Sequence, residues 1–305
     1  MLSASLVWLA VFSFPSKNLK IIACDVGQGD AILTIYGSTQ ILIDGGPGNR
    51  VLECLGKHIP FWDRQLELVI LTHPQADHYE GLTSVFREYQ VNTFVANSLN
   101  SDNQGYQVLK NEVGGSQARV INPKKGMKVR LGLIYLDILW PTTEFVTENS
   151  QNSLAVQPFN SSTAVLGAYT SSVDSNEFSV QVLLSFKDFK ALFTGDASLE
   201  LSDTVAKLLP QFLNSSVSQS VNYLKVPHHG SKNGLSEGLL KVLNPEGLPA
   251  GRRVAIISDG KNNTYGHPHK EILDILKKYN VQVYRTDEMG NIVVETDGFD
   301  FRVRP

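Results

Sequence analysis

Three side chains that can bind a metal ion follow a buried strand in the first third of the chain. His73, Asp77 and His78 come directly after the apolar run 68–71, and a helix is predicted from about residue 79 to 89. Sites in open α/β sheets form at the carboxyl ends of strands, so two imidazoles and a carboxylate at this position indicate a metal site. The alternative is a polar turn in which Asp77 caps the helix.

Further side chains of the same kinds follow predicted strands later in the chain. Asp196 ends the tripeptide Thr-Gly-Asp, where the glycine lets the backbone turn. His228 and His229 follow another strand, and His267 precedes a helix predicted over 268–278, a position that suits a phosphate. Alone, each has a structural reading, as a turn aspartate or as a capping or core histidine. Together with the first loop they place five of the seven histidines after strands, which indicates one shared site.

Length and composition exclude several classes of protein. The chain has 305 residues, 42% of them hydrophobic, which is enough for a large core. A charged fraction of 19% and a net charge of −3 argue against disorder and against a wholly basic surface, so any nucleic acid must bind through a local patch or a metal. Cys24 and Cys54 do not have the spacing of metal ligands, and two cysteines are too few for a disulfide scaffold. We therefore expect two small buried side chains.

The amino terminus differs from the rest of the chain. Residues 2–14 are apolar apart from serines, and Pro15, Lys17 and Lys20 follow them. The run is too short to span a bilayer, and no positive residue precedes it as in a secretory signal. It is the end of a membrane helix, an interfacial anchor or a strand that docks on the domain. We favour the first, with an apolar segment over 1–18 and a domain over 19–305.

The domain reads as two β-rich halves with helices attached. Apolar runs separated by glycine turns over 20–46 are typical of a β-meander, and strands alternate with helices after it. A polar insertion at about 141–176, rich in Ser, Thr and Asn, separates the halves and is predicted to lack regular structure. Two such halves, packed sheet to sheet with helices outside, give an αβ/βα sandwich with the site along one edge.

Six motifs in this order resemble one protein family. His-x-x-x-Asp-His after a buried strand resembles the metal-binding loop of the metallo-β-lactamase superfamily. The whole set is similar to the carboxyl-terminal domain of ComEC-type competence proteins, the membrane channels for DNA uptake in natural transformation. The motifs are Asp-Val-Gly-Gln-Gly-Asp-Ala (25–31), Leu-Ile-Asp-Gly-Gly (42–46), Thr-His-Pro-Gln-Ala-Asp-His (72–78), Thr-Gly-Asp (194–196), Lys-Val-Pro-His-His-Gly-Ser (225–231) and Tyr-Gly-His-Pro (265–268). The resemblance implies an α/β fold, the metallo-β-lactamase-like αβ/βα four-layer sandwich.

The resemblance also implies metal ligands. Asp77, His78 and His228 match ligands of the second metal, Asp196 matches the ligand that bridges two metals, and His73 matches a ligand of the first metal.

The first metal position departs from the family pattern. Gln75 stands where a histidine is usual, and Asn176 is the residue nearest to the place of another. His229 or His267 can compensate, and Gln75 and His229 are further candidate ligands. Because an amide oxygen is a harder ligand than imidazole, an occupied first position would suit Mn²⁺ or Mg²⁺ better than Zn²⁺. For the site as a whole, one or two divalent ions are expected, Mn²⁺ or Zn²⁺, with Mg²⁺ possible.

The function implied is metal-dependent hydrolysis of phosphodiester bonds in DNA during uptake. Asp77, Asp196 and His267 are the candidate catalytic residues, with Asp196 positioning hydroxide and His267 contacting phosphate. Two alternatives stay open: a metallo-hydrolase of a small ester, thioester, lactone or lactam, and a non-catalytic module that guides DNA. The expected partners are DNA and the membrane channel part of the uptake machinery, at the extracytoplasmic side of the membrane. No dinucleotide cofactor is expected.

Overall fold

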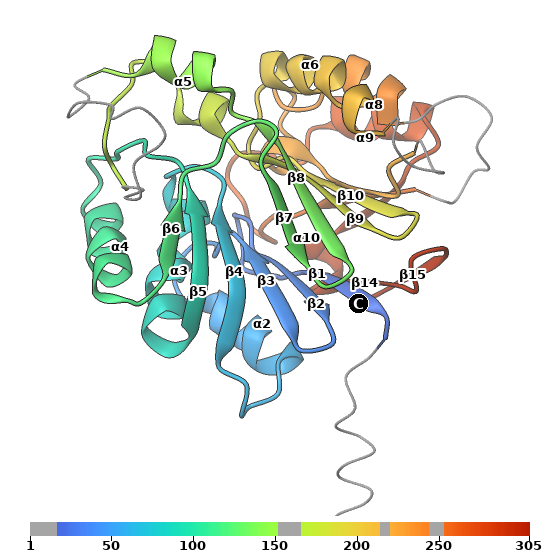
Figure 1. Cartoon of the computed structure of the whole chain (residues 1–305). Coiled ribbons are helices and arrows are strands. Elements are labelled where there is room, and N and C mark those ends of the chain that lie inside the picture. Colours follow the sequence, from blue (N-terminus) through green and yellow to red (C-terminus); the bar gives the residue numbers. More distant parts are fainter. Residues whose placement is uncertain (1–16, 152–165, 214–219, 244–252) are drawn as a thin grey trace, which may run out of the picture.

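The computed structural model describes residues 17–151, 166–213, 220–243 and 253–305. Within them, two β-sheets lie face to face, and helices cover the outer face of each sheet (Figure 1). The order of layers is therefore helices, sheet, sheet, helices. This confirms the α/β four-layer sandwich predicted from the sequence.

The first sheet contains eight of the described strands. From one edge to the other they are β15 (Phe301–Arg304), β14 (Ile292–Thr296), β1 (Leu19–Ala23), β2 (Ile32–Tyr36), β3 (Thr39–Ile43), β4 (Gln65–Leu71), β5 (Gln90–Ala96) and β6 (Arg119–Ile121). Strands β3 to β6 are parallel, and the others pair antiparallel. Its outer face packs on α2 (Arg50–His58), α3 (Ala76–Glu88) and α4 (Gln104–Gly115).

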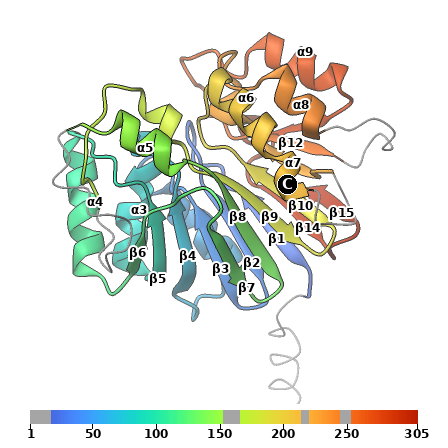
Figure 2. The same ribbon diagram turned by 45° about the horizontal axis from the view of Figure 1, so that its top comes forward.

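The second sheet contains seven of the described strands. They are, in order across the sheet, β13 (Gln282–Arg285), β12 (Val254–Ile257), β11 (Tyr223–Lys225), β10 (Phe189–Phe193), β9 (Gln181–Phe186), β8 (Ile134–Trp140) and β7 (Lys128–Leu131). Figure 2 shows α6 (Leu199–Leu208), α8 (Glu237–Leu243) and α9 (Lys270–Lys278) above this sheet. Short helices complete the described chain: α5 (Thr143–Asn149), α7 (Pro210–Leu213), α10 (Thr286–Met289) and the 3₁₀ turns η1 (Ser175–Phe178) and η2 (Pro227–Gly230).

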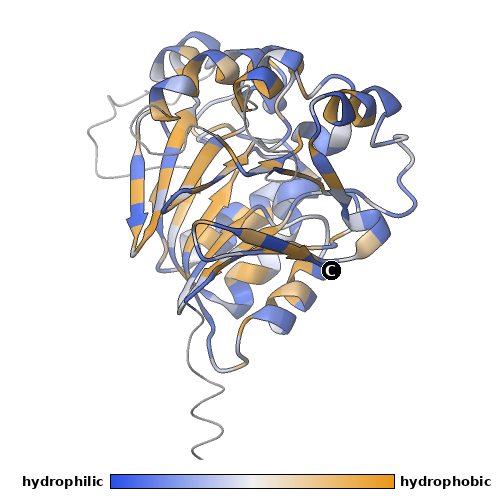
Figure 3. Ribbon diagram, turned by 90° about the vertical axis from the view of Figure 1, so that its right-hand side faces the viewer, coloured by the Kyte–Doolittle hydropathy of each residue, from blue (hydrophilic) through white to orange (hydrophobic). Residues whose placement is uncertain are grey.

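Strands buried on both faces explain why their sequences are continuous apolar runs rather than alternating ones. In β4, Leu68 and Ile70 face the other sheet, whereas Val69 and Leu71 face the helices. Figure 3 shows the apolar strands enclosed by helices with hydrophilic outer sides. The core therefore has three layers, one between the sheets and one under each set of helices.

The two halves of the chain do not each form their own sheet, as the sequence suggested. The hairpin β7–β8 belongs to the first half but pairs with β9 in the second sheet. The carboxyl-terminal hairpin β14–β15 returns to pair with β1 in the first sheet. Each hairpin has apolar residues on one face, and the exchange buries that face between the sheets.

The prediction of no regular structure over 141–176 was wrong for the described part of that segment. Helix α5 begins after Thr142, whose side chain caps it by accepting a hydrogen bond from the Phe145 N–H. Phe145 packs on the rings of Trp140 and Phe178, at centroid distances of 4.6 and 4.9 Å. A few apolar residues thus anchor a polar segment that has too little hydrophobic periodicity to be recognised. Residues 152–165 lie outside the described residues.

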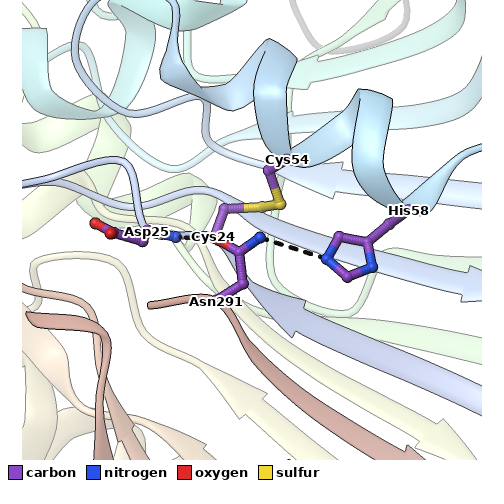
Figure 4. Close-up of a disulfide and its surroundings, with 5 residues drawn as sticks. All are labelled: Cys24, Asp25, Cys54, His58 and Asn291. Carbon is purple, nitrogen blue, oxygen red and sulfur yellow. Dashed lines mark hydrogen bonds between the residues drawn. A yellow bond between two sulfur atoms is a disulfide. The ribbon is translucent and has the colours of Figure 1, made fainter. Parts of the chain in front are cut away.

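The two cysteines are bonded to each other, so the expectation of two separate buried thiols was wrong. Cys24, at the end of β1, forms a disulfide with Cys54 on α2 (Figure 4). Beside it the Asn291 side chain accepts a hydrogen bond from the Asp25 N–H at 2.8 Å and donates one to His58 at 3.4 Å. The pairing depends on a strand and a helix crossing, which spacing along the chain does not reveal.

No helix within the described residues is long and apolar enough to cross a membrane. The apolar run 2–14, expected to be the end of a membrane helix, lies outside the described residues.

We predict that removing the disulfide destabilises the domain. The bond joins residues 30 apart in sequence, so replacing both cysteines, Cys24→Ala with Cys54→Ala, should lower the free energy of unfolding by about 3 kcal/mol. Urea unfolding of the two proteins measures the difference. An unchanged midpoint would show that the strand and the helix hold their positions without the bond.

Candidate metal centre

The candidate residues meet because the strands before them end at one edge of the sandwich. Strands β3 and β4 of the first sheet and β10, β11 and β12 of the second all point their carboxyl ends to this edge. The Val180 N–H donates to the Thr72 carbonyl here, which joins the two sheets at the site. Loops from both sheets therefore contribute side chains to one place.

Left-handed backbone positions turn three of these loops sharply. Asp44 after β3 has φ of 59°, and Gly195 after β10 has φ of 49°. His228 and His229 after β11 have φ of 50° and 51°, a conformation that residues with a Cβ rarely adopt. At Gly195 a Cβ would lie 2.9 Å from Cβ of Thr72, so a side chain does not fit. Backbone strain at the two histidines is typical of a functional site.

Four of these side chains form a compact cluster. Asp77, His78, Asp196 and His229 each offer a ligand atom, and these atoms all lie within 4.8 Å of one another. The Nε2 atoms of His78 and His229 are each 3.3 Å from an oxygen of Asp196, on Oδ1 and Oδ2 respectively. The Nε2 atom of His229 is also 3.4 Å from Oδ2 of Asp77. Asp77 and His78 come from the first turn of α3, and the other two come from the second sheet.

Buried polar atoms without hydrogen-bond partners show that the cluster fits a metal ion. Within the described residues, Nε2 of His78, Nε2 of His229 and Oδ1 of Asp196 are buried and lack such a partner. Imidazole nitrogen and carboxylate oxygen are ligands for Zn²⁺ and Mn²⁺, so a divalent ion would satisfy all three atoms.

A second layer of hydrogen bonds aims the two histidines at the centre of the cluster. Nδ1 of His78 is 2.9 Å from Oδ2 of Asp44, and Thr72 donates to the same carboxylate. Nδ1 of His229 is 2.8 Å from the Ser258 carbonyl. Because a carbonyl only accepts, this Nδ1 carries a proton, and Nε2 is the ligand atom of the neutral ring. Partners of this kind fix the tautomer and orientation of metal-binding histidines.

The carboxylates control the charge of these histidines. Burial opposes protonation of His229, but Asp196 and Asp30 outweigh it and raise its pKa to about 10. Burial likewise opposes protonation of His78, and Asp196 and Asp44 nevertheless hold its pKa well above the usual value. Without metal, both rings are therefore protonated at neutral pH and serve as counter-ions for the acids.

The structure places His229 in the cluster and His228 beside it. The resemblance favoured His228 as the ligand, with His229 as a lesser candidate. Nε2 of His228 is 3.9 Å from Oδ2 of Asp196, and the side chain is 30% exposed. His267 lies further out, with its ring centroid 5.9 Å from that of His228. Both rings flank the cluster on its more exposed side.

The residues expected at a first metal lie on the other side of His78. The ring of His73 is 4.2 Å from the ring of His78, and its Nε2 atom is buried without a hydrogen-bond partner among the described residues. Burial lowers the pKa of His73 to about 3, so the ring is neutral. The Gln75 amide nitrogen donates to Ser175 Oγ at 2.9 Å, and Asn176 Oδ1 is buried with no hydrogen-bond partner in the described ranges. This position therefore offers one imidazole and amide oxygens.

Three buried residues next to the cluster, Lys225, Asp30 and Asp44, were not identified as site residues from the sequence. The Lys225 ammonium contacts Asp30, donates to the Gly195 carbonyl at 3.1 Å and lies 3.6 Å from Oδ1 of Asp196. Asp30 and Asp44 could also form a metal group with His78. Because Lys225 already neutralises Asp30, we place the ion at the cluster of four instead. All three residues lie in motifs quoted from the sequence (25–31, 42–46 and 225–231), and this position was the signal that could have identified them.

We predict that metal binding at pH 7 releases protons. The pKa of His78 is held well above its usual value and that of His229 is raised to about 10, so the metal-free protein holds protons there that a metal ion must displace. Affinity for Mn²⁺ should therefore rise with pH between 6 and 8. Calorimetric titration in two buffers of different ionisation enthalpy counts the protons, and a heat that is the same in both would contradict the assignment.

We also predict that Asp44 matters for metal affinity although it does not bind the metal. Asp44→Asn removes the negative charge of the group that hydrogen-bonds with Nδ1 of His78 and orients its ring. Affinity for Mn²⁺ should therefore fall by roughly 10–100-fold. The control Asp300→Asn removes an exposed carboxylate in the turn between β14 and β15 and should leave affinity unchanged. Equal affinities of both variants would show that His78 needs no such support.

Comparison with known proteins agrees with the fold and the motifs. No family model matches the chain. It is 26% identical to ComE operon protein 3 of Bacillus subtilis, over 94% of this chain and 34% of that protein. It is 26% identical to recombination protein 2 of Haemophilus influenzae, over 88% of this chain and 28% of that protein. The chain thus spans about a third of the length of these relatives.

A solved structure shares the architecture. The metallo-β-lactamase fold protein YhfI of Bacillus subtilis superimposes with a TM-score of 0.54 at 13% identity, over 91% of this chain and 99% of that one. At this identity the likeness concerns the fold alone. The chain therefore has the metallo-β-lactamase fold, and its sequence is similar to ComEC-type proteins over most of its length.

Proposed function

We propose that the domain is a metal-dependent hydrolase that cleaves phosphodiester bonds in DNA. The observation that carries this proposal is the cluster of Asp77, His78, Asp196 and His229, with three buried ligand atoms that lack hydrogen-bond partners in the described part of the chain. When bound there, a divalent ion would make hydroxide available near neutral pH and offset charge on the phosphoryl oxygens. The chain then needs no serine, cysteine or lysine nucleophile.

The residues around the cluster have distinct roles in this proposal. Asp196 is buried and reaches both histidines of the cluster, so it orients the attacking group. His228 and His267 flank the exposed side, where a substrate phosphate would arrive. Burial, followed by nearby histidines, lowers the pKa of His267 to about 4, so it is a neutral hydrogen-bonding group at pH 7. His267 would therefore contact a phosphate oxygen through a ring N–H rather than as a cation.

The disulfide supports the proposed location of the domain. Disulfides persist in oxidising compartments and are rare in the cytosol. The Cys24–Cys54 bond therefore favours an extracytoplasmic position at the membrane, as proposed from the resemblance. A role beside the channel during DNA uptake remains a proposal, supported by the relatives ComE operon protein 3 and recombination protein 2.

We predict metal-dependent degradation of DNA by the purified chain. The protein is stripped of metal, resupplied with Mn²⁺, Mg²⁺ or Zn²⁺, and incubated with labelled DNA. The variant Asp77→Ala/His78→Ala loses two of four cluster residues, so its rate should fall by roughly 10³-fold or more. The matched control Asp300→Ala/His58→Ala removes the same two residue types outside the cluster and should keep its activity.

The result can also reject the proposal. A folded protein that binds metal but cleaves no DNA with any of the three ions would exclude a nuclease. Small esters, thioesters, lactones and lactams would then be tested with the same proteins. Inactivity on these as well would leave the non-catalytic, DNA-guiding module.

A further inference from the structure

An exposed tyrosine lies in the loop that brings His267 to the site. Residues 258–269 connect β12 to α9 at the site edge of the sandwich. Tyr265 is 67% exposed, and its ring stacks on the ring of His267 with a centroid distance of 5.7 Å and an interplanar angle of 23°. Tyr265 is not a member of any hydrophobic cluster of the described residues, so its ring face is open to a ligand.

The stacked pair continues a row of rings that ends at the metal cluster. The ring of His267 lies 5.9 Å from that of His228, whose Nε2 atom is 3.9 Å from Oδ2 of Asp196. Tyr265 is therefore two rings away from the cluster.

Exposed cations accompany the tyrosine. Lys261 lies in the same loop, and Lys232 follows the His228–His229 turn. The two loops are joined, since the Lys232 N–H donates to Nδ1 of His269 at 3.3 Å. No ion pair between described residues involves either lysine, and the one acid in 258–269, Asp259, is buried. Positive side chains beside an open aromatic ring are the combination that binds single-stranded nucleic acid.

We propose that Tyr265 is a stacking platform for an unpaired base of the DNA strand whose phosphate enters the metal cluster. This inference rests on the proposed function and names its substrate class, a single-stranded DNA segment or end. In a duplex each base is already stacked and paired, so its ring face is not available to a protein side chain without unpairing. The platform therefore selects single strands over blunt duplexes.

Binding measured without turnover tests this inference separately from the nuclease proposal. Fluorescence anisotropy of a labelled 12-nucleotide oligo(dT) is recorded with the full chain in EDTA, where no cleavage occurs. The same titration uses a blunt 12-base-pair duplex. The variants are Tyr265→Ala, Tyr265→Phe, which keeps the stacking ring, and Phe299→Ala, which removes an aromatic side chain exposed at the opposite edge.

We predict that Tyr265→Ala weakens oligo(dT) binding at least about five-fold, because base stacking on one aromatic residue has an effect of about this size or larger. Tyr265→Phe and Phe299→Ala should stay within about two-fold of the original chain. The duplex should bind more weakly than oligo(dT), and Tyr265→Ala should not change its affinity.

Three results would overturn the inference. In the first, the original chain does not bind oligo(dT) measurably. In the second, Tyr265→Ala binds oligo(dT) with unchanged affinity. In the third, Tyr265→Ala loses affinity for oligo(dT) and for the duplex equally. A failed cleavage assay with intact, tyrosine-dependent binding would instead reject the nuclease and keep the binding site.

Discussion

Four carboxylates gathered at one edge of the sandwich set the constraint that the rest of the structure must meet. Asp30, Asp44 and Asp196 are almost fully buried, and Asp77 is 31% exposed. Unpaired buried charges are costly, and like charges repel strongly where water is excluded. One cation, Lys225, is built into the fold and pairs with Asp30. The remaining charge is met by protons on histidines or by a metal ion, and this competition links folding, pH and metal binding.

The architecture keeps these acids together against their repulsion. The hairpins that cross between the sheets and the disulfide between β1 and α2 hold the strand ends in place. Close approach matters as well: a Cβ at Gly81 in α3 would lie 2.1 Å from the Gly45 carbonyl. Only glycine at position 81 lets α3 approach the loop after β3, and α3 carries Asp77 and His78 into the site.

Much of the fold could be predicted from the sequence, because strands buried on both faces leave long apolar runs and their ends are marked by polar residues. Which strands pair with one another was harder to predict. The apolar sequences of β8 and β14 do not indicate which sheet each strand joins. The hairpins β7–β8 and β14–β15 join the sheet of the other half of the chain because their apolar faces are buried there, which only the three-dimensional structure shows. The pairing of Cys24 with Cys54 was missed for the same reason, since it depends on how a helix crosses a strand.

The candidate site was likewise predictable in part, because some of its residues are marked in the sequence and others are revealed only by three-dimensional contacts. Residue types and their positions after strands led to Asp77, His78 and Asp196, which the structure brings together. The resemblance favoured His228 over His229, whereas the structure groups His229 with these three residues, because two consecutive left-handed residues determine which ring turns inward. Lys225 looked like an ordinary strand residue, and only its burial beside Asp30 reveals its charge-balancing position.

X-ray diffraction from crystals grown with Mn²⁺, recorded on both sides of the manganese absorption edge, tests the central claim most directly. The account predicts an anomalous peak coordinated by Asp77, His78, Asp196 and His229 at about 2.0–2.3 Å. A peak held by His228 in place of His229, or by Asp30 and Asp44 with Lys225 displaced, would contradict it. So would the absence of any peak at this edge of the sandwich in a protein that binds Mn²⁺ elsewhere.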